Sequence, residues 1–187
     1  MNLVQIIKRG KIYTYSNLLS LLRIFLGFVV YLLLIDRHTL GALLIVVLAI
    51  ITDYADGYLA RKRDEISELG KILDPLADKV AIACAVLALY QSYDLPFWIL
   101  LIIIGRDILI LFGSTLLLGK VKSVVASELP GKVAVTVISL LILIYILELN
   151  FFKNIFLFLT AITIIFSFFF YALKFIKIYL NSRSEKE

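Results

Sequence analysis

Residues 53–78 read DYADGYLARKRDEISELGKILDPLAD and join two long apolar runs of the chain. Asp53 and Asp56 are three positions apart, so a helix carries both carboxylates on one face. Asp74 and Asp78, four positions apart, make a second pair of the same kind. If the charged residues between the pairs form a turn, the two helices run antiparallel and both pairs meet at one level. Four like charges in one place then require a compensating cation or partner.

The rest of the chain is far more apolar than this segment. Of its 187 residues, 62% are hydrophobic and only 18% are charged, whereas soluble proteins carry about 25% charged residues. The apolar runs approach the roughly 20 residues that a helix needs to cross a bilayer. The predicted fold class is therefore an all-α, polytopic membrane protein. Six transmembrane helices are expected at residues 17–35, 40–61, 70–91, 96–118, 131–149 and 152–178.

These helices are expected to form one membrane domain that takes up the whole chain, residues 1–187. It comprises an interfacial segment at 1–13 with a short helix in the headgroup layer, a six-helix bundle at 17–178 and a polar tail at 179–187. Basic residues set the orientation, because positively charged short loops stay in the cytoplasm. Fourteen of the 19 basic residues fall in segments on one side, and only Arg37 and Lys153 fall in breaks on the other. Both chain ends and the acidic segment are thus predicted on the cytoplasmic side of the inner (cytoplasmic) cell membrane.

The acidic segment has the ligand chemistry of a divalent-cation site. Carboxylate oxygens with no histidine or cysteine beside them favour Mg2+ or Mn2+ over zinc. Since Mg2+ is commonly shared between a few carboxylates and substrate phosphates, a phosphate-bearing ligand is indicated. Gly57, Ala60 and Gly70 leave room beside the acids for a bulky nucleotide, although small residues also serve close helix packing. Arg61 is placed to bind a phosphate, or it is simply one of the basic residues on the cytoplasmic side.

This segment resembles the signature of the CDP-alcohol phosphatidyltransferase family, which is DxxDGxxAR, eight residues, and then GxxxDxxxD. All eight signature positions match with no change in spacing. The resemblance implies a metal site that binds the cytidine diphosphate and is formed by Asp53, Asp56 and Asp74. It also implies that Asp78 borders this metal site, where it is counted as a fourth metal ligand, and acts as the general base. The nucleotide site would be lined by Gly57, Ala60, Arg61 and Gly70. The cytidine is named by the family alone, whereas the residues themselves indicate metal and phosphate.

The reaction implied is the transfer of a phosphatidyl group from CDP-diacylglycerol to the hydroxyl of a small alcohol, with release of CMP. A CDP-linked ether lipid is an alternative donor. Four basic residues around the fourth and fifth predicted helices favour an acceptor that itself carries phosphate: Arg106, Lys120, Lys122 and Lys132. Two simpler roles for these residues stay open. Arg106 can form a local charge pair with Asp107, and the lysines can simply follow the positive-inside rule.

Glycerol-3-phosphate is the first choice of acceptor. Three short blocks resemble phosphatidylglycerophosphate synthases: Asn17 with Arg23, Arg106 with Asp107, and Gly131 with Lys132. Asn17 and Arg23 are in addition candidate contacts for the lipid or the nucleotide. Arg-Asp replaces the Arg-Glu that is usual in such enzymes, so an inositol phosphate or another polar alcohol stays open as the acceptor.

A divalent-cation or proton-coupled transporter is the main alternative of another class, because such proteins also place carboxylates within the membrane. The acids here lie near one membrane face, whereas a transport site is expected near the midplane between repeats. A structural membrane anchor would leave the spacing of the aspartates unexplained. The family resemblance suggests a homodimer in the lipid bilayer. Nucleic acid is not an expected partner, since the net charge of +5 is distributed as cytoplasmic loop charge.

Overall fold

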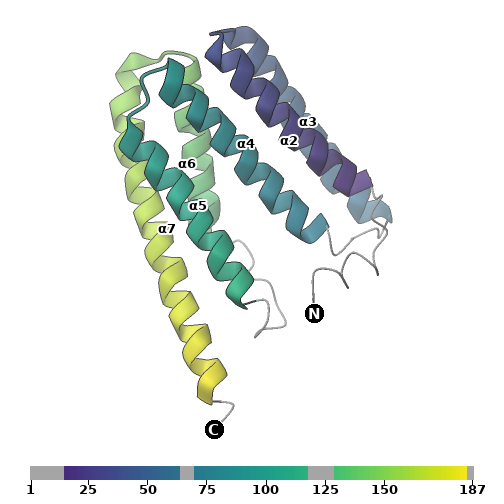
Figure 1. The fold of residues 1–187 in the computed structure, drawn as a ribbon, viewed down its shortest axis with the longest axis vertical. Coiled ribbons are helices and arrows are strands. Elements are labelled where there is room, and N and C mark those ends of the chain that lie inside the picture. Colours follow the sequence, from purple (N-terminus) through teal and green to yellow (C-terminus); the bar gives the residue numbers. More distant parts are fainter. Residues whose placement is uncertain (1–14, 64–69, 118–128, 185–187) are drawn as a thin grey trace. The chain divides into compact units, whose positions relative to one another are not determined.

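The computed structural model describes residues 15–63, 70–117 and 129–184, and in these ranges it contains six helices and no strand. The helices are α2 (Tyr15–Ile35), α3 (Thr39–Arg63), α4 (Gly70–Ser92), α5 (Phe97–Leu117), α6 (Leu129–Ile146) and α7 (Asn150–Ser184) (Figure 1). Side chains are described for residues 17–51, 73, 75–110 and 129–173. The prediction of an all-α protein is confirmed.

The chain divides into two compact units, Met1–Asp94 with α2 to α4 and Leu95–Glu187 with α5 to α7. We call them unit 1 and unit 2, and each is described by itself. The six helices coincide with the six predicted apolar stretches, and their ends differ by at most three residues except at one point. The exception is α7, which continues to Ser184. The predicted interfacial segment at 1–13 lies outside the described residues.

Three helices within the described residues are long and apolar enough to cross a membrane. They are Asn17–Ile35, Leu129–Ile146 and Asn150–Leu173, and Thr39–Ile51 is a shorter apolar helix. Large apolar side chains cover the outer surfaces of the units: Leu40 is 73% exposed, Phe151 80% and Phe158 68%. Lipid accommodates such surfaces, whereas soluble monomers rarely expose large contiguous apolar patches. The protein is thus of the membrane type, and six spans remain a prediction.

Hydroxyl groups on these helices are bonded within the helices that carry them. Thr136, Ser139 and Thr163 each donate a hydrogen bond of 3.0 Å to the carbonyl oxygen four residues earlier. A hydroxyl without a partner costs free energy in an apolar medium. The helix backbone supplies the acceptor here, so these polar residues fit a helix that faces lipid.

Two of the helix-to-helix turns are closed by residues in the left-handed conformation. Arg37, between α2 and α3, has φ 56°, and Glu148, between α6 and α7, has φ 52°. In both turns this residue and the next one donate their N–H groups back to carbonyls of the preceding helix. That pattern is the Schellman motif, which satisfies the last carbonyls of a helix and reverses the chain. Each turn therefore joins two antiparallel helices.

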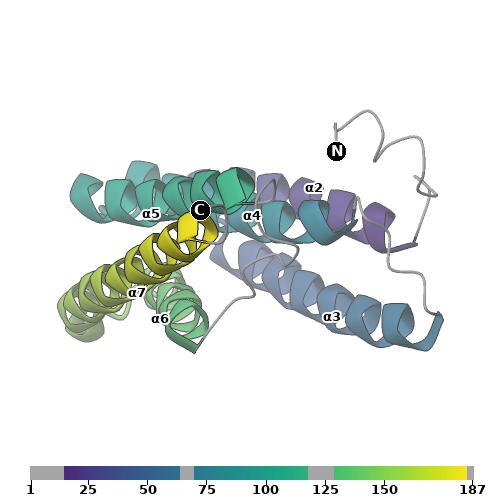
Figure 2. The ribbon, with the colours of Figure 1, turned by 90° about the horizontal axis from the view of Figure 1, so that it is seen from below.

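In unit 1, α2 is the helix against which the other two pack (Figure 2). α2 and α4 run parallel, because Gly27 of α2 meets Ala81 of α4, while Ile35 near the end of α2 meets Ser92 at the end of α4. α3 returns antiparallel to α2. The N-terminal ends of α2 and α4 and the C-terminal end of α3 consequently lie at one end of unit 1 (Figure 1).

The contact between α2 and α4 is close because Gly27 has no side chain. A Cβ atom on Gly27 would lie 2.9 Å from Ala81 Cα and 3.1 Å from its Cβ. One turn further along α2, Tyr31 donates a hydrogen bond of 2.9 Å to Gln91 Oε1 of α4. Small residues at a helix crossing allow backbones to approach and to gain dispersion energy where lipid provides no hydrophobic driving force.

In unit 2, α7 packs against both α5 and α6. The α6–α7 pair is antiparallel: Gly131 in the first turn of α6 lies against the hydroxyl end of Tyr171. At the other end of this pair, Lys153 Nζ lies 5.0 Å from the centroid of the Tyr145 ring, which is a cation–π contact. Pro130 occupies the first turn of α6, where its missing N–H leaves no hydrogen bond unmade.

Gly27→Ala is expected to destabilise the protein. The new Cβ meets the backbone of α4, and overpacking of this kind costs about 1–3 kcal/mol, of which helix propensity returns up to about 1 kcal/mol. Gly105→Ala is the matched control, since its Cβ would meet nothing within 4 Å, and it should be neutral or slightly stabilising. Thermal unfolding in detergent, followed by circular dichroism, measures both variants. Equal midpoints for Gly27→Ala and the wild type would contradict the close contact.

Candidate active site

The signature residues lie on two helices of unit 1. Residues 53–61 belong to the C-terminal half of α3, and residues 70–78 belong to the N-terminal half of α4. The side chains of seven predicted site residues lie outside the described residues: Asp53, Asp56, Gly57, Ala60, Arg61, Gly70 and Asp74. Their backbone is helical, so each aspartate pair keeps the spacing that puts it on one face. Asp78 is the signature aspartate whose side chain is described.

Both signature segments lie at the same end of unit 1, where α3 ends and α4 begins (Figure 1). We call this end, formed by residues 15–23, 53–63 and 70–78, the signature end. α3 and α4 make their main contacts with α2 and not with each other within the described residues. The N-terminal half of α2 therefore contributes to the signature end together with α3 and α4, and the motif alone does not predict this contribution.

Asp78 is bound to an arginine of α2. Nη1 of Arg23 donates to Asp78 Oδ1 over 2.7 Å, and the two charges form an ion pair. The Arg23 side chain is only 9% exposed, whereas that of Asp78 is 58% exposed. The Arg23 guanidinium thus lies buried between the two helices, and the Asp78 carboxylate stays accessible. Arg23 was a predicted lipid or nucleotide contact, and the structure adds this ion pair.

The buried face of α2 changes from polar to apolar along the helix. Asn17, Ser20 and Arg23 are 4%, 0% and 8% exposed, and the face continues with buried Leu26, Val30 and Leu34. The polar stretch belongs to the signature end. Ser20 was missed in the sequence, although its three-residue spacing from Asn17 and Arg23 is a signal of a shared helix face. Such a face within an apolar helix is typical of a functional surface.

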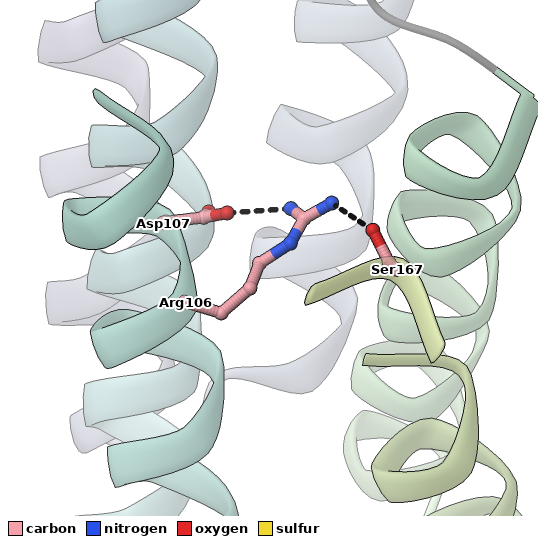
Figure 3. Close-up of polar contacts among 3 residues, drawn as sticks. All are labelled: Arg106, Asp107 and Ser167. Atoms are coloured by element: carbon pink, nitrogen blue, oxygen red, sulfur yellow. Dashed lines mark hydrogen bonds and ion pairs between the residues drawn. The ribbon is translucent and has the colours of Figure 1, made fainter. Parts of the chain in front are cut away.

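Arg106 in unit 2 is held by two polar partners (Figure 3). Its Nη1 donates to Asp107 Oδ1 over 2.6 Å, and its Nη2 donates to Ser167 Oγ of α7 over 3.1 Å. Arg106 and Asp107 are 5% and 7% exposed. The local charge pair, one of the two alternatives for Arg106, is therefore present. Ser167 was not predicted; a lone serine within the aromatic run of residues 166–171 is the signal that was available.

Of the three lysines predicted at the acceptor site, the structure describes Lys132. Lys132 is exposed in the first turn of α6, where its carbonyl oxygen accepts a bond of 3.0 Å from Thr136. The hydrogen bonds of Arg106 go to Asp107 and Ser167. Lys120 and Lys122 lie outside the described residues. Grouping of these basic residues around an acceptor stays a prediction.

Of the four aspartates expected at the metal site, Asp78 is the one whose side chain the structure describes. The described side chains contain no group of three or more histidine, cysteine or acidic residues that could hold a metal ion, because three of the four signature aspartates are outside them. Asp78 fits the expected donor set, since it presents an exposed carboxylate, a hard oxygen ligand suited to Mg2+ or Mn2+.

Comparison with known proteins gives a family for these features. The family model for CDP-alcohol phosphatidyltransferase matches residues 13–170. A CDP-diacylglycerol–glycerol-3-phosphate 3-phosphatidyltransferase of Bacillus subtilis is 40% identical over 51% of this chain and 49% of its own length. A cardiolipin synthase (CMP-forming) of Streptomyces coelicolor is 35% identical over 56% of this chain and 52% of its own length.

A longer match comes from a probable phosphatidylglycerophosphate synthase of Mycobacterium tuberculosis, 32% identical over 78% of this chain and 72% of its own length. The chain spans about half the length of the Bacillus and Streptomyces relatives. The family match, in contrast, includes α2 to α6 and the larger part of α7, and it covers most of the chain. The chain belongs to the CDP-alcohol phosphatidyltransferase family.

Proposed function

We propose that this protein transfers a phosphatidyl group from CDP-diacylglycerol to the hydroxyl of glycerol-3-phosphate and releases CMP. The observation that carries the proposal is Asp78, an accessible carboxylate in the N-terminal half of α4 at the signature end. The family match over residues 13–170 supports the reaction class. The same reasoning applies to a CDP-linked ether lipid, because the signature residues are proposed to bind the cytidine diphosphate that both donors share.

In this mechanism the aspartates have two tasks. Asp53, Asp56 and Asp74 would hold the divalent ion, Mg2+ or Mn2+, with Asp78 at its border. When bound, the ion supplies positive charge that offsets the diphosphate of the donor.

Asp78 accepts the proton of the acceptor hydroxyl on a carboxylate oxygen. The acceptor oxygen forms a bond to the lipid-linked phosphorus, while the bond from that phosphorus to the oxygen of CMP breaks. Gly57, Ala60, Arg61 and Gly70 would line the nucleotide site and position the leaving group.

The choice of acceptor follows from the relatives and from charge. Two of the three relatives named above are described by glycerol-3-phosphate or phosphatidylglycerophosphate, and the third is a cardiolipin synthase. The basic residues proposed to bind the acceptor phosphate are Arg106, Lys120, Lys122 and Lys132. A guanidinium can bind phosphate oxygens through two parallel hydrogen bonds. In the structure Nη1 and Nη2 of Arg106 donate to Asp107 and Ser167, so a bound acceptor phosphate would take over one or both of these donors. An inositol phosphate would meet the same residues.

The proposed enzyme works within a membrane. The site and both chain ends lie on the cytoplasmic side of the inner cell membrane, as the distribution of basic residues favours. The chain acts as one membrane domain, residues 1–187, and as a homodimer. The apolar outer surfaces of the helices support its place in the bilayer.

Purified protein is expected to release CMP from CDP-diacylglycerol when Mg2+ and glycerol-3-phosphate are present. A panel with inositol phosphate, free inositol, serine and choline should show slower release. Chelation of divalent ions should stop the reaction, and added Mg2+ or Mn2+ should restore it. CMP is measured by chromatography. Absence of release with every acceptor, together with cation flux in proteoliposomes that lack CDP-lipid, would favour a transporter.

Arg106→Lys is expected to raise the KM for glycerol-3-phosphate about tenfold or more, because an ammonium group cannot replace two parallel hydrogen bonds to phosphate. The KM for CDP-diacylglycerol should not change. Asp107→Asn is a companion variant that keeps the guanidinium but removes the charge of its neighbour. A lower unfolding temperature with an unchanged KM in both variants would make Arg106 a packing residue and not an acceptor contact.

A further inference from the structure

Arg23 is an arginine on the buried side of an apolar helix. A charged residue within a membrane-spanning helix costs about 2.5–3.5 kcal/mol on insertion scales, so a partner must offset the cost. One such partner is Asp78, at 2.7 Å. Among the four signature aspartates, Asp78 is the one to which the proposed reaction gives the proton of the acceptor.

The two members of this pair are held very differently. Arg23 is 9% exposed at its side chain and lies one turn before Gly27, where α2 and α4 come into close contact. Its position is therefore fixed by helix packing. Asp78 is 58% exposed, and an exposed side chain exchanges between rotamers unless a contact selects one of them. Because Arg23 is fixed by the helix contact, the ion pair restricts the accessible Asp78 carboxylate to one orientation.

A second arginine in unit 1 shows what a purely structural contact looks like. Arg37 donates to the backbone carbonyl of Ser92 and lies 5.2 Å from the centroid of the Tyr93 ring. Thr39 and Tyr93 are joined by a hydroxyl contact of 3.3 Å at the same place. These contacts hold the turn between α2 and α3 against the C-terminal end of α4, at the end of unit 1 opposite to the signature end. Arg23 instead directs its charge at a signature carboxylate.

We propose that Arg23 is a positioning residue for phosphatidyl transfer, which orients the Asp78 carboxylate toward the hydroxyl of the acceptor. Arg23 acts through Asp78 and does not contact the substrates. This inference rests on the proposed function, since it gives Asp78 the role of base. It assigns to α2 a role in catalysis that the signature on α3 and α4 does not contain.

Kinetics of CMP release test this role with Arg23→Gln, Arg23→Lys and the control Arg37→Gln. For Arg23→Gln we expect kcat per folded protein to fall about 10- to 100-fold, as for a misplaced catalytic group. The KM values for CDP-diacylglycerol and for the acceptor should stay within about twofold. Arg23→Lys should recover some of the lost kcat, because it restores a cation. Arg37→Gln should lower the unfolding temperature and leave kcat unchanged.

Three results would overturn the positioning role while the wild type releases CMP. They are an unchanged kcat in Arg23→Gln, a raised KM for either substrate with kcat intact, and no recovery in Arg23→Lys. A wild type that releases no CMP with any acceptor would instead overturn the proposed function.

A thermal double-mutant cycle of Arg23→Gln and Asp78→Asn supplies a readout without substrate. The two losses in unfolding temperature should be clearly non-additive, since either variant removes the same ion pair. Additive losses would overturn the inference, because Arg23 would then not act through Asp78. If Arg23→Gln folds poorly, a cycle of Arg23→Met and Asp78→Asn decides the case, because methionine also removes the cation.

Discussion

The close parallel contact between α2 and α4 is the constraint on which the rest of unit 1 depends. Gly27 meets Ala81 in its apolar region, and Arg23 meets Asp78 in a charged region that lies a single helical turn away. The apolar contact sets how near the helices lie, and the ion pair sets where the carboxylate of α4 is held. Because the helices are parallel, α3 must return between them in the chain, and this places its aspartates at the end where α4 begins.

This arrangement gives the two ends of unit 1 different characters. The end opposite to the signature is fastened by the Schellman turn at Arg37, by its contact with Ser92 and by the contact between Thr39 and Tyr93. At the signature end, the buried face of α2 is polar and carries Asn17, Ser20 and Arg23. A polar surface in an apolar helix is costly and commonly marks a functional site, which supports the proposal that α2 contributes to the site together with α3 and α4.

Much of the fold follows from local sequence, and the rest depends on pairings that local sequence does not encode. Runs of apolar residues predicted the six helices, and the adjacent charges of Arg106 and Asp107 made a local pair one of the two roles considered for Arg106. The pairing of Arg23 with Asp78 crosses 55 positions, and helix periodicity carries no information about which helices run parallel. Ser167 was missed for the same reason, since its partner is on another helix. The turns at Arg37 and Glu148 lack the glycine that usually marks them.

The carboxylates of α3 and α4 are proposed to hold a divalent ion together at the signature end. Electron paramagnetic resonance of Mn2+ with purified protein and CDP measures this directly, because the spectrum of free Mn2+ loses intensity as the ion binds. The wild type should bind Mn2+, Asp53→Asn and Asp78→Asn should weaken binding about tenfold or more, and Asp36→Asn, an exposed aspartate in a turn outside the site, should bind as the wild type does. Equal Mn2+ binding by all four proteins would contradict the shared metal site.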